Sequence, residues 1–363
     1  MFDFLIAHLL FISTIILFLI KLIWRIFMNW GKTAVLNESP SSPSLRIEPC
    51  PECGFPAVFQ EDKFRCLHCG AATPFCEEKT EKPDVWLNER LYSLNAEAMK
   101  FFQWLLAHQP KSKAYAESRG LTDPVCKEFG IGASASNYGD STVTRNLLKK
   151  GFSADDLVLT GISCRDEQGM LIDRYIGRLM FPIFTAHGKV AGFSGRTMID
   201  AKAKYVNSPE SPIFQKSHLL FMENRAFAPA NKAIVLCEGQ MDAVTQQIYG
   251  INCAMATLGT ALSEYNVARI KTTGKPIYLC FDADNAGVKA TARAIGMFGV
   301  NNVKVVNLAP YKDPDELLRA VGKAGYAKCI NAAIPADKWL VQHSENPIKT
   351  ALMLLEKEFY GGK

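Results

Sequence analysis

From residue 230 onward, short apolar runs alternate with helical segments, and this alternation is the feature that most constrains the fold. The runs "AIVLCEG", "INCAMATLG", "PIYLCFDAD" and "VKVVNL" have the length and composition of buried strands. Between them, "MDAVTQQIYG", "LSEYNVARIK" and "GVKATARAIGMFG" are typical of helices. Strands that alternate with helices in this way predict a parallel sheet with crossover helices, which is an α/β fold.

Acidic residues follow three of the predicted strands. Glu238 follows "AIVLC", Asp282 and Asp284 follow "PIYLC", and Asp313 and Asp315 come just after "VKVVNL". Functional groups of parallel sheets gather beyond the carboxyl ends of the strands. Carboxylates this close repel each other unless a hard cation neutralises them, and oxygen ligands suit Mg²⁺ or Mn²⁺. We therefore predict a metal site; the alternative is that Asp282 and Asp284 only cap the next helix.

The segment before the predicted parallel sheet is organised differently. Residues 171–200 alternate apolar runs with glycine-containing turns, which is typical of an antiparallel hairpin. Further upstream, the stretch "LNAEAMKFFQWLLAH" has helical periodicity. One face of this predicted helix collects the apolar residues Leu94, Ala98, Phe101, Phe102 and Leu105.

Positive charge is concentrated around the predicted hairpin. The chain has a formal net charge of +5, and residues 171–225 contain eight Lys/Arg against four Asp/Glu. This excess predicts a surface that faces a polyanion, although an ordinary solvated face is the alternative.

Four cysteines have the spacing of a zinc site. The pattern is Cys50-x₂-Cys53-x₁₂-Cys66-x₂-Cys69, and a glycine follows each pair. Two such knuckles predict a tetrahedral four-thiolate Zn²⁺ ribbon. Three other cysteines lie within apolar runs, which favours a reducing compartment over a disulfide framework.

The N-terminus holds a long apolar run. Residues 4–20 carry no charge, and as a helix these 17 residues would span roughly 25 Å, slightly less than the ~30 Å hydrocarbon core of a bilayer. Lys21, Arg25 and Lys32 follow, and positive charge stays on the cytoplasmic side. We expect a membrane anchor with the bulk of the chain in the cytoplasm; the alternative is that the protein starts at Met28.

Several sequence blocks resemble a known family. "EGQMDAV", "ATLGTAL", "FDADNAGVKA" and "KDPDELL" are similar to the TOPRIM domain of bacterial primases, topoisomerases and some nucleases. The upstream blocks "GRLMFPI", "GKVAGFSGR" and "KYVNSPESPIFQKSHLLF" resemble more narrowly the catalytic core of DnaG-type bacterial primases. The resemblance covers about residues 89–330 and implies a TOPRIM (Rossmann-like) parallel sheet, preceded by a mixed α+β primase subdomain and a small zinc ribbon.

Composition, cysteine spacing and the resemblance together divide the chain into expected parts. These are a possible transmembrane segment (1–28), a linker (29–49), the zinc ribbon (50–76), a second linker (77–88), the N-terminal subdomain of the primase core (89–229), the TOPRIM domain (230–325) and a short helical C-terminal region (326–363).

The implied activity is DNA-templated synthesis of short RNA primers in DNA replication. The resemblance implies that ribonucleoside triphosphates are joined by metal-dependent nucleotidyl transfer, with Glu238 as general base or metal ligand. Asp282 and Asp284 would be the metal pair, and Asp313 and Asp315 would complete the Mg²⁺ or Mn²⁺ site. The implied contacts to single-stranded DNA template are Arg178, Arg196, Lys204, Asn207 and Lys216.

Three features depart from the family pattern. The zinc ribbon is shorter than usual and has four cysteines where a histidine is normal, so its role could be structural or a docking point. Gln240 stands where many relatives carry an aromatic residue, whereas Glu238 and Asp242 are kept. Fewer than forty residues follow "DPDELLRAVGKAGY", so we expect no helicase-binding domain and a primase of a mobile element.

Two other functions are compatible with the same acids. A TOPRIM nuclease or topoisomerase would use them for strand cleavage, but the "KYVNSPESPIFQKS" block argues against both. The second alternative is a non-catalytic, membrane-tethered and zinc-containing protein that binds single-stranded nucleic acid and keeps the TOPRIM fold as a scaffold. Loss of the acids would be its signature, and all of them are present.

Overall fold

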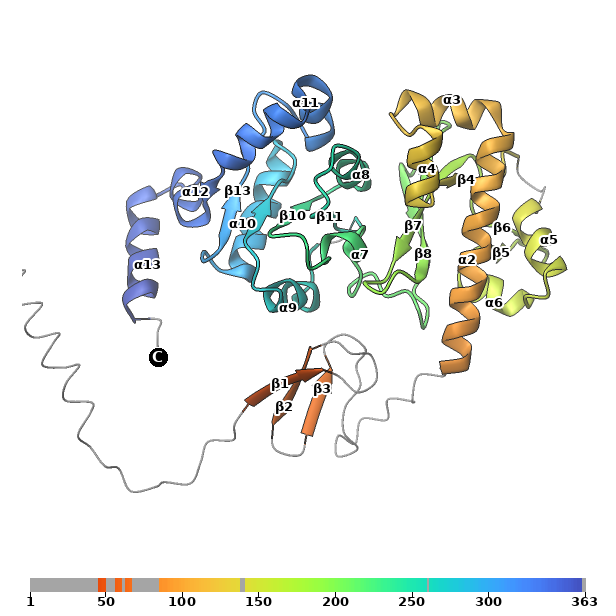
Figure 1. Cartoon of the computed structure of the whole chain (residues 1–363), viewed down its shortest axis with the longest axis horizontal. Coiled ribbons are helices and arrows are strands. Elements are labelled where there is room, and N and C mark those ends of the chain that lie inside the picture. The colour runs from red at the N-terminus through yellow and green to blue at the C-terminus, as the bar shows by residue number, and fades with distance from the viewer. Residues whose placement is uncertain are drawn as a thin grey trace, which may run out of the picture.

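The computed structural model describes residues 45–49, 56–60, 63–66, 85–137, 141–259 and 261–360 (Figure 1). The predicted membrane segment and Cys50, Cys53 and Cys69 of the predicted zinc site lie outside these ranges. Cys66 is described only through its backbone, at the end of a strand. Among the described residues, none of the helices combines the length and the apolar character needed to span a bilayer.

A small antiparallel sheet precedes the main body of the chain. Its order is β1-β2-β3, and the strands are β1 (Leu45–Pro49), β2 (Pro56–Gln60) and β3 (Lys63–Cys66). β1 and β2 pair with Leu45 opposite Gln60. β1 therefore lies in the segment predicted as a linker, so regular structure starts before the first cysteine of the predicted ribbon.

The next part is built on a long helix and a four-stranded sheet. The helix α2 (Val85–His108) packs against β4 and β8 and begins inside the second predicted linker. The sheet has the order β4-β7-β8-β9, with β4 (Gly132–Ala133), β7 (Arg178–Phe184), β8 (Val190–Thr197) and β9 (Tyr205–Asn207). β7 and β8 form the predicted antiparallel hairpin. Around them lie α3 (Pro110–Ser118), α4 (Asp123–Phe129), α5 (Thr142–Lys149), α6 (Ala154–Leu159), β5 (Ser163–Arg165) and β6 (Leu171–Asp173).

The β7–β8 hairpin is buried on both faces because its side chains alternate between two cores. Phe181 packs edge-to-face against Phe221, with ring centroids 6.3 Å apart, on the side of the second half of the chain. Met180 instead joins the core beneath α2, where Phe102 of α2 packs edge-to-face on Phe193 at 5.1 Å. The helix therefore covers the side of the hairpin that faces away from the parallel sheet (Figure 1).

The predicted parallel sheet is present. Its order is β11-β10-β12-β13-β14, and all neighbouring strands are parallel except the last pair. The strands are β10 (Ile234–Cys237), β11 (Ala254–Ala256), β12 (Ile277–Leu279), β13 (Val303–Val305) and β14 (Ile334–Pro335). The crossover helices are α8 (Gln240–Ile248), α9 (Glu264–Thr272) and α10 (Asn285–Phe298). Mixed α/β architecture with a parallel sheet is thus confirmed.

Helices cover both faces of this sheet. Side chains of α9, α10 and α12 (Ala336–Gln342) share one core with Ile234, Leu279 and Val305. On the other face, α11 (Pro314–Asn331) packs against α8 and buries Leu317 and Tyr326. α11 crosses the predicted boundary at residue 325, and β14 adds to the sheet from beyond it. The segment predicted as a separate helical region therefore contributes to the sheet before it ends in α13 (Pro347–Tyr360).

A buried ion pair ties the short helix α7 (Glu223–Ala226) to α9. Arg269 donates from Nη2 to Glu223 Oε1 at 3.0 Å and from Nη1 to Glu223 Oε2 at 3.1 Å. The side chains are 4% and 1% exposed, respectively. Glu223 also accepts from the Leu220 backbone N–H at 2.9 Å, and the Arg269 guanidinium lies over the rings of Phe227 and Tyr265.

Candidate active site

The carboxyl edge of the parallel sheet brings the predicted acids together from separate strands. Glu238 directly follows β10, and Asp282 follows β12, which is hydrogen-bonded to β10. The backbone N–H of Asp282 donates to Glu238 Oε1 at 3.3 Å. The next residue, Ala283, donates from its N–H to the carbonyl of Lys312 at 2.8 Å, which joins this turn to the segment that leads into α11.

Two of the predicted metal ligands also cap helices. Asp284 Oδ1 accepts from the backbone N–H groups of Ala286 and Gly287, both at 2.9 Å, at the start of α10. Asp313 Oδ1 accepts from the Glu316 N–H at 2.8 Å at the start of α11. Such caps satisfy N–H groups that lack a partner within the helix. Asp284 is therefore the N-cap residue of α10, as the alternative expects, and Asp282 is not; capping does not prevent the free carboxylate oxygen of Asp284 from binding a cation.

Gly287 allows α10 to start directly above Asp282. A Cβ atom at this position would lie 1.9 Å from the Asp282 carbonyl oxygen. The backbone of the acid pair and the first turn of α10 are therefore in contact at a point that only glycine can occupy without displacement.

The electrostatics of this edge disfavour ionised carboxylates. Burial raises the pKa of Asp282, and the neighbouring charges of Asp313 and Asp284 raise it further, while Lys312 and Lys204 oppose the shift. The pKa of Glu238 is also raised, first by burial and then by Asp282 and Asp284. The carboxylate charges repel one another more than the nearby lysines compensate, which is the condition that a divalent cation relieves.

Asp242 is the functional candidate to which the sequence reasoning gave no role. It lies in the first turn of α8 and is only 8% exposed, and burial, followed by the charges of Asp313 and Asp282, raises its pKa to about 8. Its Oδ1 accepts from the Asp315 N–H at 3.3 Å. The signal was its position four residues after Glu238, one helical turn into the helix that leaves the same strand end.

Asp315 is bound by neighbouring side chains. It accepts a hydrogen bond from Thr245 Oγ1 and another from Arg319 Nε at 2.9 Å. The sequence prediction placed it in the cation site, and here it joins α11 to α8 at the margin of the acid group. In the part of the chain that the structure describes, no three acidic, cysteine or histidine side chains already converge in a metal-ligating arrangement. The donor set is nevertheless all oxygen and electrostatically uncompensated, so its chemistry fits a hard cation.

The predicted template residues fall into two groups. Lys204 is exposed, and its charge opposes the rise in the pKa of Asp282. Asn207 of β9 donates from Nδ2 to the Leu258 carbonyl at 2.7 Å and so joins the hairpin sheet to the parallel-sheet half. Lys216 is partly exposed, and its backbone N–H donates to Glu210 Oε1 at 3.2 Å.

Arg178 and Arg196 are engaged within the four-stranded sheet. Arg196 is 8% exposed, and it donates to the hydroxyls of Tyr115 at 3.3 Å and Tyr205 at 2.9 Å. Arg178 Nη1 donates to the carbonyls of Gly195 at 2.9 Å and Ala203 at 3.2 Å. Both arginines therefore stabilise the β7–β9 region, whereas Lys204 is exposed.

Two protein-family models match consecutive parts of this chain. The family model for the N-terminal domain of the DNA primase catalytic core matches residues 101–227, and a Toprim-like model matches residues 235–318. A DNA primase of Clostridium acetobutylicum is 34% identical over 255 residues, which are 68% of this chain and 41% of that protein. The chain thus spans about two fifths of the length of the curated relatives it matches.

Solved structures match over a larger share of their length. A DNA primase domain from Pseudomonas aeruginosa is 33% identical with a TM-score of 0.63, and the match covers 69% of this chain and 82% of that one. The DnaG primase catalytic domain bound to single-stranded DNA is 29% identical with a TM-score of 0.63, covering 71% and 85%.

Proposed function

Because this chain belongs to the DnaG-type primase family, we propose that it is a DNA primase that makes short RNA primers on single-stranded DNA by metal-dependent nucleotidyl transfer. One observation carries the proposal: Glu238 and Asp282 meet at adjacent strand ends of the Toprim-like half, and Asn207 of the primase-specific half is hydrogen-bonded to Leu258 of that half. The acid group thus lies in one matched region, and the charge of Lys204 from the other matched region acts on Asp282.

The side chains have separate tasks in this proposal. Glu238 and Asp282, with Asp284 and Asp313, would hold Mg²⁺ or Mn²⁺, which lowers the pKa of an attacking 3′-hydroxyl and neutralises charge on the triphosphate. Glu238, whose pKa is raised, is suited to accept the proton of that hydroxyl. Asp242, buried and with a pKa of about 8, would act by positioning the Asp315 backbone.

Lys204, Asn207 and Lys216 would contact the template. Lysine contacts to phosphate give binding that depends on salt and little on sequence. Arg178 and Arg196 would support this surface by holding β7, β8 and β9 in place, since their guanidinium groups are already hydrogen-bonded within the sheet. For the zinc module we propose a four-thiolate Zn²⁺ site at Cys50, Cys53, Cys66 and Cys69, on the spacing alone.

The test is primer synthesis by the full chain. Single-stranded DNA, labelled ribonucleoside triphosphates and Mg²⁺ or Mn²⁺ should yield short RNA products that disappear with EDTA. Binding of single-stranded DNA without any product would instead favour the non-catalytic protein, and degradation of the DNA would favour a nuclease.

A divalent cation is expected to raise the thermal unfolding midpoint of the wild-type chain. The reason is that folding brings the carboxylates of Glu238, Asp282 and Asp313 together. A cation that relieves their repulsion therefore binds the folded state and stabilises it. Differential scanning fluorimetry with 0 to about 10 mM Mg²⁺ or Mn²⁺, near the concentration scale at which a weak oxygen site saturates, measures this shift. The Asp282→Asn variant is expected to lose most of the shift, and an equal shift in both proteins would argue against the proposed ligands.

A further inference from the structure

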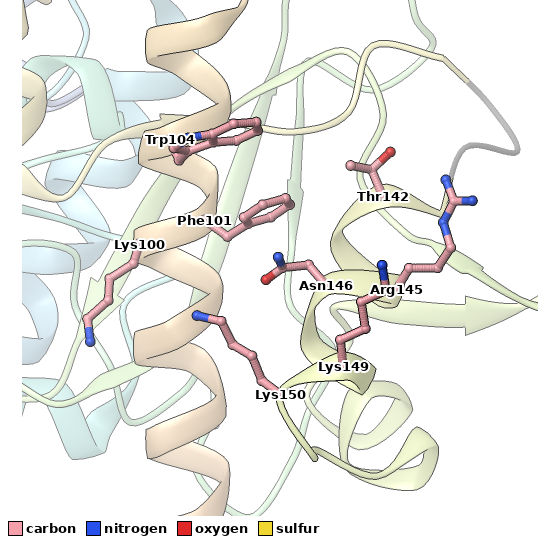
Figure 2. Close-up of a pocket in the computed structure, with 8 residues that line it drawn as sticks. All are labelled: Lys100, Phe101, Trp104, Thr142, Arg145, Asn146, Lys149 and Lys150. Atoms are coloured by element: carbon pink, nitrogen blue, oxygen red, sulfur yellow. The ribbon is translucent and has the colours of Figure 1, made fainter.

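A basic groove lies between α2 and α5, on the side of the β7–β8 hairpin that faces away from the parallel sheet (Figure 2). Its volume is about 620 Å³. The lining side chains that matter here are two aromatic rings, Phe101 and Trp104, and four cations, Lys100, Arg145, Lys149 and Lys150. Within the described part of the chain, no acidic residue lines it.

The aromatic side of the groove is a row of stacked rings along α2. Phe101 and Trp104 have ring centroids 5.5 Å apart and planes within 8° of each other. Trp104 in turn stacks on His108 at 4.2 Å and 24°. The row follows from the helical spacing, because residues three and four apart lie on the same face. Trp104 is 50% exposed, although indole is usually well buried in a protein interior.

The cationic side comes mostly from α5 and the residue after it. Arg145 and Lys149 are exposed on α5, and Lys150 points across the groove toward α2 (Figure 2). Glu97 of α2 is an acid beside the groove: it accepts from Lys100 Nζ at 2.6 Å and also pairs with Lys150. Among the described residues that line the groove or pair with its lining, the four cations outnumber this carboxylate, so the surface around the rings is positive.

This combination fits one class of ligand better than others. Cations that track phosphates beside exposed rings that stack on bases are the features of sequence-tolerant single-strand binding. A duplex does not offer unstacked bases to the rings. A membrane surface would need an exposed apolar helix face, but Val143 and Leu147 of α5 are buried in the core beneath α2.

We propose that the α2–α5 groove binds single-stranded nucleic acid, as a second contact surface outside the acidic site. Bases would stack on Trp104, and phosphates would contact Arg145 and Lys149. The inference does not depend on catalysis, because the groove and the acids lie on different sides of the hairpin. Failure of one proposal therefore leaves the other standing.

The test is binding of fluorescein-labelled dT₂₀ and rU₂₀ to the full chain, followed by anisotropy in EDTA at several salt concentrations. Replacing Trp104 by Ala is expected to weaken binding about 5- to 150-fold, and Trp104→Phe should restore most of it, because any aromatic ring can stack. The double variant R145E/K149E should reduce the slope of log K against log[salt] by about 1.4, as expected for two lost phosphate contacts. The two oligonucleotides show whether the groove prefers DNA or RNA.

A matched control distinguishes the loss of groove contacts from the effect of a changed net charge. K323E/K328E removes the same charge from exposed positions on α11, and its binding should stay near wild type after allowance for net charge. An equal loss in this control, or unchanged binding in Trp104→Ala and R145E/K149E, would overturn the proposal. A labelled Glu-rich peptide tests the other ligand class. If the groove variants lose binding of this peptide while their binding of dT₂₀ is unchanged, the proposal is overturned in favour of an acidic protein segment as the ligand. Photocrosslinking of 5-iodouracil in the oligonucleotide should mark the peptide that contains Trp104.

Discussion

The Asp282→Asn variant is expected to lose about 1,000-fold in the rate of primer synthesis. The amide keeps the shape of the carboxylate but removes the charge that a divalent cation would bind. Metal stabilisation of a phosphoryl transition state amounts to several kcal/mol, and each 1.36 kcal/mol is a factor of ten in rate. A loss of about 4 kcal/mol corresponds to that factor. The measurement is the initial rate of labelled RNA formation at saturating template and nucleotides.

The fold of this variant should be intact. Burial and neighbouring acids raise the pKa of Asp282, so its charge is unfavourable in the folded protein without metal, and the amide relieves that repulsion. The Glu238→Gln variant should likewise keep its fold and lose primer synthesis. Asp337→Asn makes the same chemical change at an exposed position of α12 and should keep the wild-type rate. A variant of Asp282 that retains more than about a tenth of the rate would contradict a metal-ligand role, since that loss is below 1.4 kcal/mol.

The Arg269→Ala variant is expected to lower the free energy of unfolding by about 3–5 kcal/mol, because it leaves Glu223 as a buried charge without its partner. Burial raises the pKa of Glu223, and Arg269 is the main group that opposes this rise, so removing the arginine leaves the desolvation cost opposed only by backbone hydrogen bonds. Urea unfolding followed by far-UV circular dichroism measures the change.

The double variant E223L/R269M tests the cause of that loss. Two apolar side chains of similar size remove both charges together, and replacing a complete buried ion pair in this way is often neutral. The double variant should therefore be more stable than Arg269→Ala alone. Arg293→Ala, at an exposed position of α10, should change stability by less than about 0.5 kcal/mol. Equal destabilisation by the single and double variants would show that packing, and not the unpaired charge, causes the loss.

Much of the parallel-sheet half could be predicted from the sequence, since its strands are short continuous apolar runs. The predicted run "PIYLCFDAD" contains β12, and all of "GVKATARAIGMFG" except its last glycine lies within α10. The fifth strand, β14, could not be predicted. It is two residues long, and its place in the sheet comes from antiparallel pairing with β13, a tertiary contact that leaves no periodic pattern.

The acid positions were predictable, but their hydrogen bonds were not. Strand ends locate Glu238 and Asp282 on one edge of the sheet because all parallel strands end there. The engagement of Asp315 with Thr245 and Arg319 depends on how α11 packs against α8. Arg196 shows the same limit in the other half: a charge count places it on a surface, whereas Tyr115 and Tyr205 bind its guanidinium in the sheet.

Asp284 has two roles, and this affects how genetic data on this protein are interpreted. Its carboxylate both belongs to the acid pair and begins α10, so an alanine allele removes a charge and frays a helix at once. An asparagine allele keeps an oxygen that caps about as well as a carboxylate while it removes the charge. Asparagine is therefore the separation-of-function allele at this codon, and the same reasoning applies to Asp313 at the start of α11. An alanine scan of this edge would merge folding defects with chemical ones, and asparagine alleles would keep the two phenotypes distinct.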